Sequence, residues 1–140
     1  MTYSFDGYNY LIKLQKGEKL MASLNQFAEE TKLEGGWINI LGSALGMTLG
    51  FYDLDKKQYQ WHDFAGLYEI TGITGNLAYD DQNKPVFHLH GTFAGRDFKA
   101  IGGHVKDLTS GATVEIFIHR SFKSVKRMHD EASGLQTLDL

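Results

Sequence analysis

The stretch Pro85-Val-Phe-His-Leu-His-Gly-Thr-Phe93 alternates between apolar and polar side chains, and it organises the rest of the chain. Successive side chains of a β-strand point to opposite faces. The apolar residues therefore share one face, which we expect to lie on the hydrophobic core. They are Phe87, Leu89 and Phe93. His88 and His90 share the other face, two residues apart, where both rings can reach one ion.

A third histidine follows on what we predict to be the next antiparallel strand, residues 98–105. His104 comes directly after Gly102 and Gly103, which leave room for a close approach of the backbone. Three neutral imidazoles are a common ligand set for zinc with an open position. The spacing alone makes His88, His90 and His104 a candidate site for a divalent metal ion, with zinc as the expected ion. The alternative is a set of ordinary polar residues on a solvated or subunit-facing surface.

Composition narrows the class of protein. The chain has 140 residues, a formal net charge of −3 and no cysteine. The charge argues against a broad nucleic-acid footprint, which needs a basic excess. The lack of cysteine excludes disulfides and thiolate ligands and is compatible with the cytoplasm. The sequence shows neither a signal peptide nor an apolar run of about 20 residues. We expect one soluble, cytoplasmic domain over residues 1–140.

Hydrophobic periodicity predicts one helix and at least six strands. Residues 17–33 carry apolar side chains at helical spacing and end before two glycines. The predicted strands, besides the two with histidines, are 8–14, 36–53 (as two strands or one long bent strand), 59–63, 68–79, 113–120 after a turn at Ser110-Gly111, and possibly 135–140 at an edge. The fold class is therefore α+β, a mostly antiparallel, sheet-rich single domain with one main helix packed on the sheet.

The order of short motifs resembles the PPC domain, the plants and prokaryotes conserved domain, over nearly the whole chain. The matching pieces are Leu11-Ile-Lys-Leu-x-x-Gly17-Glu18, Ile40-Leu-Gly-Ser43, Glu69-Ile-Thr-x-x-x-Gly75-Asn76, His88-Leu-His90, Gly102-Gly-His-Val105, Thr113-Val-Glu115, and Arg127-x-x-Asp130 with Gly134-Leu-x-x-Leu138. The resemblance implies a sheet-rich mixed fold and a homotrimer. It also implies a distant fold relation to acetolactate decarboxylase, a zinc enzyme whose metal site is a His-x-His pair plus a further histidine.

Plant members of this family carry an AT-hook before the domain and support transcriptional regulation, and free-standing prokaryotic members are often called DNA-binding by association. This chain has no Arg-Gly-Arg-Pro core, and its one proline, Pro85, follows Lys84. The part that enters the minor groove is absent, so the DNA-binding function transfers poorly from the plant proteins.

Two glutamates in the matching motifs are candidates for a role beside the metal. Glu69 and Glu115 are expected either to accept hydrogen bonds from the histidine ligands or to act as general acid or base beside a metal-bound water. Alternatively, they form ion pairs with arginines across a subunit boundary, since charged residues are rarely buried unpaired. The sequence does not decide whether the protein is an enzyme.

The one basic cluster, residues 119–127, is short, and the protein as a whole is acidic. The cluster is expected to be a solvated rim, with phosphate contact as the alternative. Arg127 and Asp130 are predicted to be a structural pair.

Three hypotheses follow. The first is a homotrimer with a histidine metal site that serves an unknown small molecule. The second is a regulatory or scaffolding protein with weak DNA association, and the third is a structural trimer without chemistry.

Overall fold

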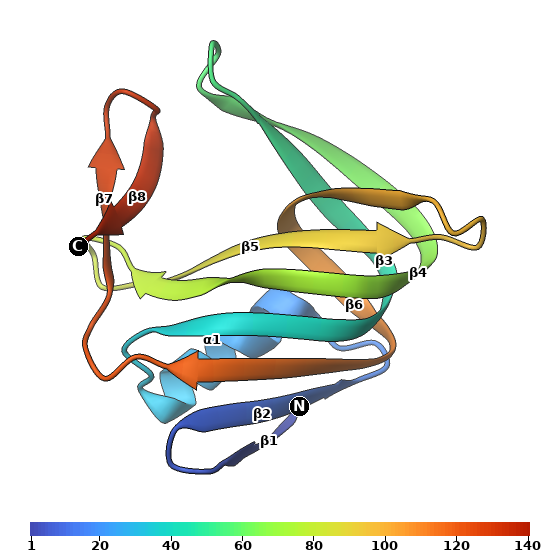
Figure 1. The fold of residues 1–140 in the computed structure, drawn as a ribbon, viewed down its shortest axis with the longest axis horizontal. Coiled ribbons are helices and arrows are strands. Elements are labelled where there is room, and N and C mark those ends of the chain that lie inside the picture. The colour runs from blue at the N-terminus through green and yellow to red at the C-terminus, as the bar shows by residue number, and fades with distance from the viewer.

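Three long, bent strands dominate the computed structural model, which describes residues 1–140 (Figure 1). The elements in chain order are β1 (Thr2–Phe5), β2 (Asn9–Gln15), α1 (Leu20–Thr31), β3 (Gly36–Asp53), β4 (Gln58–Tyr79), β5 (Pro85–Ala94), β6 (Ala100–Arg120), β7 (Lys126–Asp130) and β8 (Leu135–Asp139). All strand pairings are antiparallel except one short parallel contact between β4 and β7. The structure confirms the predicted α+β class.

The sheet order is β1-β2-β6-β3-β4-β7-β8, and β5 pairs with both β4 and β6. Because β3, β4 and β6 bend midway, each belongs to two parts of the molecule. One part contains β1 and β2 and lies against α1. In the other part, residues 47–53 of β3 pair with residues 58–64 of β4 and form an arm that extends away from the helix (Figure 1).

The bend in β3 requires a glycine. The pairing register shifts on both sides of Gly42, whose φ of 134° is unfavourable for other residues. A Cβ at this position would lie 2.3 Å from the carbonyl oxygen of Thr113. Residues 36–53 therefore form one long bent strand, the second of the two forms that the sequence allowed.

Three predicted strand boundaries are wrong. Residues 59–63 and 68–79 belong to one strand, β4, because a bulge at Gly66 (φ 103°) absorbs the irregularity without ending the pairing. No turn occurs at Ser110-Gly111. Ser110 lies buried in continuous β6, and its backbone bonds to Gly17 and Glu18 hold the strand in place. Finally, β6 begins at Ala100 because Phe98 lies in the preceding turn.

The helix is shorter than the predicted 17–33. Lys19 still has an extended backbone at the N-cap, and Lys32 ends the helix in the left-handed conformation, before the two glycines. Its buried stripe matches the prediction and packs toward β6 and β5. The buried residues are Leu20, Ser23, Leu24, Phe27 and Ala28.

The end of the chain forms a hairpin of β7 and β8. The predicted strand in residues 135–140 is confirmed, whereas β7 was not predicted. The hairpin turn contacts the arm, since the Tyr52 hydroxyl donates to the carbonyl of Ser133 at 2.8 Å. The helix of this structure is neither long nor apolar enough to span a bilayer.

Candidate metal centre

Strand β5 places two of the predicted ligands on one face. Phe87, Leu89 and Phe93 are 6%, 0% and 0% exposed, so the predicted core face is confirmed. His88 is partly buried and His90 is exposed on the opposite face. The alternation in the sequence therefore sorts the side chains of this strand correctly.

Strand β6 brings the third histidine to the pair. His104 lies directly opposite His90 in the register of β5 and β6. The strands approach closely here, because a Cβ at Gly102 would lie 2.8 Å from the carbonyl oxygen of Gly91. The two glycines before His104 therefore provide the room that the sequence indicated.

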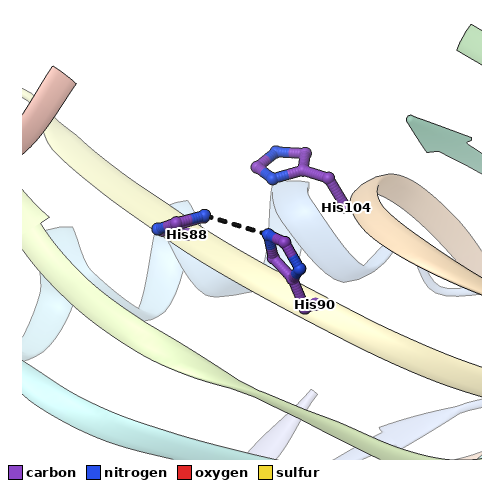
Figure 2. A group of neighbouring side chains, drawn as sticks. All are labelled: His88, His90 and His104. Atoms are coloured by element: carbon purple, nitrogen blue, oxygen red, sulfur yellow. Dashed lines mark hydrogen bonds between the residues drawn. The ribbon is translucent and has the colours of Figure 1, made fainter. Parts of the chain in front are cut away.

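The three rings converge on one point, with His88 and His90 on β5 and His104 on β6 (Figure 2). Their ring centroids are 5.0 to 5.3 Å apart, and one nitrogen from each ring lies within 4.8 Å of the others. The Nε2 atoms of His88 and His90 are 3.1 Å apart. Two nitrogens on one tetrahedral zinc ion, each at about 2.0–2.1 Å from it, are separated by about 3.3 Å. The donors therefore fit a zinc-type ion after small movements of the rings.

The electrostatic environment keeps two of these rings in the form that binds metals. Burial, aided by the neighbouring histidines and Arg127, lowers the pKa of His104 to about 4. Burial also lowers the pKa of His88, with a further contribution from Arg127. Both rings are therefore neutral at pH 7, and a neutral imidazole is the ligand that divalent metals require.

The hydrogen-bond partners of the cluster are not the expected glutamates. The Tyr59 hydroxyl, on the arm, lies 3.3 Å from Nδ1 of His104, and Nη2 of Arg127, on β7, lies 3.3 Å from Nδ1 of His88. The Tyr59 ring also packs against His104 at a centroid distance of 4.8 Å. Burial raises the pKa of the Tyr59 phenol, so it is protonated at neutral pH.

The two glutamates lie elsewhere on the sheet. Glu69 and Glu115 are exposed, and neither makes a hydrogen bond or an ion pair within the chain. The expected hydrogen bonds to the histidines are therefore absent. Glu115 and His90 both line a concavity of about 770 Å³. Glu69 lies opposite Ser43 and Ala94, and it does not line this concavity.

Arg127 is the functional neighbour that sequence reasoning assigned to the wrong partner. Its side chain is 5% exposed and donates to Asn76 Oδ1 at 2.7 Å and to the Gln136 carbonyl at 2.6 Å. Asp130 instead accepts from Ser133 in the hairpin turn, so the predicted Arg127–Asp130 pair does not form. Arg127 stood within a recognised motif, but its three-residue spacing from Asp130 could not show that the Arg127 side chain reaches His88.

The predicted basic cluster is dispersed by internal contacts. The Arg120 guanidinium lies over the ring of Phe122 at 4.8 Å, and Lys126 donates to Asn83 Oδ1 at 2.7 Å. His119 pairs with Asn9, and Arg127 is buried. The structure therefore presents no continuous row of free cations along this segment.

The fold and the site together define an α+β domain with a His-x-His pair and a third histidine on the neighbouring strand. The chain belongs to the Plants and Prokaryotes Conserved (PCC) domain family, whose model matches residues 1–121. Strands β7 and β8, including Arg127, lie beyond this match. None of the curated proteins matches the sequence significantly.

Two solved structures resemble the whole chain. A candidate DNA-binding protein from Bacteroides thetaiotaomicron is 25% identical, with a TM-score of 0.94 and coverage of 99% of this chain and 96% of its own. A metal-containing protein from Archaeoglobus fulgidus is 27% identical, with a TM-score of 0.87 and coverage of 100% and 99%. Acetolactate decarboxylase from Bacillus subtilis shares the fold more distantly, at 16% identity and a TM-score of 0.60 over 84% of this chain and 54% of that one.

Proposed function

We propose that this chain binds a divalent metal ion, most favourably zinc, through His88, His90 and His104. The observation that carries the proposal is the convergence of three ring nitrogens within 4.8 Å. The description of the Archaeoglobus relative as metal-containing supports it. Three histidine ligands leave a coordination position open for water or a small ligand. When bound there, zinc supplies a Lewis acid and lowers the pKa of its water to about 7.

The ligand would enter from the concavity at His90. Glu115 also lines this concavity, which supports a role as general acid or base toward a bound small molecule. Glu69 remains a second candidate that would act from a position outside the concavity. Neither glutamate contacts the histidine cluster within the single chain.

We further propose that the chain assembles as a homotrimer in the cytoplasm, as the family resemblance implies. Support comes from apolar side chains exposed on the sheet face opposite the helix. Leu11, Leu41 and Phe117 are about half exposed there and line the same concavity. Large apolar side chains gathered on one face are typical of an interaction surface. A trimer that covers this face would turn the open concavity into an enclosed pocket.

Elemental analysis of protein purified without chelator tests the metal site. We expect about one zinc-type ion per chain at a defined oligomeric mass. The variants His88→Ala, His90→Ala and His104→Ala should each lose most of the metal while keeping their circular-dichroism spectrum. The matched control is His62→Ala, because His62 is exposed on the arm and its ring packs against Phe64 rather than against the histidine cluster. Wild-type protein without metal after incubation with zinc would contradict the proposal and favour the structural trimer.

The second candidate function is association with DNA, favoured by the description of the Bacteroides relative. Such binding should weaken steeply with salt, because it depends on phosphate contacts. A duplex titration at 20 mM and 200 mM salt measures this dependence. Absence of binding at the lower salt would exclude DNA binding by the chain alone.

A further inference from the structure

Arg127 is the one charged side chain that is hydrogen-bonded to the histidine cluster. It is 5% exposed and has no carboxylate partner in the chain, and its Nε is buried without a hydrogen bond. Arginine is rarely buried this way without compensation of its charge. The metal-ligating set therefore has a fixed positive charge beside it, where metal-bound histidines usually have a carboxylate or a carbonyl acceptor.

The two contacts of the cluster differ in what they permit. A tyrosine hydroxyl can donate or accept, so Tyr59 can accept from Nδ1–H of His104 while Nε2 binds a metal. A guanidinium can only donate. The contact from Arg127 therefore requires a lone pair at Nδ1 of His88, which places the ring hydrogen on Nε2.

In the metal-free chain, the hydrogen on Nε2 of His88 can be accepted by Nε2 of His90. The Nε2 atoms of His88 and His90 are 3.1 Å apart, so His88 can donate to His90 across this contact (Figure 2). A neutral His88 that binds metal through Nε2 must instead carry its hydrogen on Nδ1, where it would face the N–H of Arg127. Metal binding through Nε2 of His88 therefore removes the favourable hydrogen bond from Arg127 to Nδ1. In its place, the N–H of Arg127 and Nδ1–H of His88 face each other as two donors.

Charge acts in the same direction as the hydrogen bonding. Imidazole ligands carry no negative charge, so they compensate none of the charge of a divalent ion. Lys106 lies two residues after His104, and its Nζ is 4.9 Å from the centroid of Trp61, which packs edge-on against His104. Glu69 and Glu115 do not contact the cluster. A bound metal thus adds two positive charges to an environment that is already positive.

We propose that this site takes a divalent metal and a small oxyanion, such as a carboxylate, as a coupled pair, and that Arg127 is the positioning residue that sets this coupling. The inference rests on the proposed metal site. The anion enters through the concavity at His90 and occupies the open coordination position. Its negative charge offsets the positive charges of the metal ion and Arg127. There Gly91, Gly102 and Gly103 carry no side chains that would obstruct it, and the Thr92 side chain is exposed beside them.

The test is titration of the whole chain with Co²⁺, whose visible absorption reports ligand number without any enzymatic readout. Each titration is made at equal ionic strength in acetate, the carboxylate probe, and in perchlorate, which coordinates poorly. Wild-type protein should bind Co²⁺ at least fivefold more tightly in acetate. Arg127→Gln should bind at least tenfold more tightly than wild type in perchlorate and lose most of the acetate effect.

Lys126→Gln is the matched control, because it removes one positive charge from the adjacent position of β7 where Nζ contacts Asn83 rather than the cluster. It should behave as wild type. If Arg127→Gln fails to fold, the ratio of the Co²⁺ affinities of wild-type protein in acetate and in perchlorate tests the coupling by itself. The inference is overturned if wild-type protein binds Co²⁺ equally well in acetate and in perchlorate and folded Arg127→Gln does the same. That result would leave the metal site intact. Absence of Co²⁺ binding in every sample would instead remove the proposed metal site, and this inference with it.

Discussion

The two faces of the central sheet differ sharply although adjacent residues of the same strands form them. On the face against α1, Ile38 and Ile116 are fully buried. Their sequence neighbours Trp37 and Phe117 point the other way and are 53% and 43% exposed. Both faces are rich in apolar side chains, but the chain supplies only one helix to cover them. One face is therefore completed within the chain, and the other is open for a partner or a ligand.

The face covered by α1 serves mainly the stability of the fold, and we expect the open face to serve binding and assembly. The covered face contains most of the side chains that exclude water, and their burial is the main favourable contribution to folding. The open face contains the concavity, Glu115 and His90. Substitutions on the covered face should therefore lower the free energy of unfolding, and those on the open face should alter assembly and binding.

The largest effect should come from truncating the core under the helix. Phe27 is fully buried, and its ring packs edge-on against Tyr10 at 4.9 Å and Tyr3 at 5.1 Å. Phe27→Ala should lower the free energy of unfolding by about 3–5 kcal/mol, measured by urea denaturation. The matched variant Phe117→Ala should cost less than about 1 kcal/mol in the monomer. Its larger effect should be on oligomeric mass, and equal losses from both variants would contradict the contrast between the faces.

A glycine on β4 provides the next largest effect. A Cβ at Gly75 would lie 1.9 Å from the carbonyl oxygen of His88, so an alanine must push β4 away from β5. We expect Gly75→Ala to destabilise the protein by about 2–3 kcal/mol and to reduce metal affinity by displacing His88. Gly72→Ala is the control on the same strand, because its Cβ would meet nothing within 4 Å. Loss of metal in both variants would show that strand spacing does not control the site.

Acidification should produce a moderate loss of stability in the metal-free protein. The pKa of His104 is about 4 in the folded chain, mainly through burial, against 6.5 for an unperturbed histidine. Between these values the unfolded chain binds a proton that the folded chain does not, so stability falls as the pH falls from 6.5 to 4. For a partly exposed ring we expect roughly 1–2 kcal/mol.

Urea denaturation with chelator at pH 7 and pH 4.5 measures this change. His104→Gln should flatten the dependence in this window, and an unchanged slope would mean that other groups cause it. His88 should contribute in the same direction, since burial lowers its pKa as well.

The smallest effect should come from the arm. Tyr59→Phe removes only the hydroxyl that lies 3.3 Å from Nδ1 of His104 and keeps the ring packed against the imidazole. Because the contact is long, we expect a few-fold loss of metal affinity and a change in stability below about 1 kcal/mol. Isothermal titration with zinc measures the first quantity. A loss as large as that of His104→Ala would mean that the hydroxyl itself belongs to the binding site.

Local patterns predicted those features that depend on neighbours in the sequence. The two faces of β5 followed from alternation, and the buried stripe of α1 followed from helical spacing. The breaks in β4 and β6 were predicted wrongly, because the apolar alternation is interrupted between residues 63 and 68 and because Ser110-Gly111 resembles a turn signal. Strand pairing with β3 overrides those signals, and no local pattern contains that information.

The sequence by itself determined the class of fold, the orientation of His88 and His90 toward one side of their strand, and the identity of the third histidine, because strand periodicity and glycine spacing are local properties. Only the tertiary structure decided which groups surround the cluster. Arg127 follows His88 by 39 residues, with the whole of β6 between them, and Tyr59 comes from the arm. Their proximity depends on the bends of three long strands, which arise from pairings between distant segments.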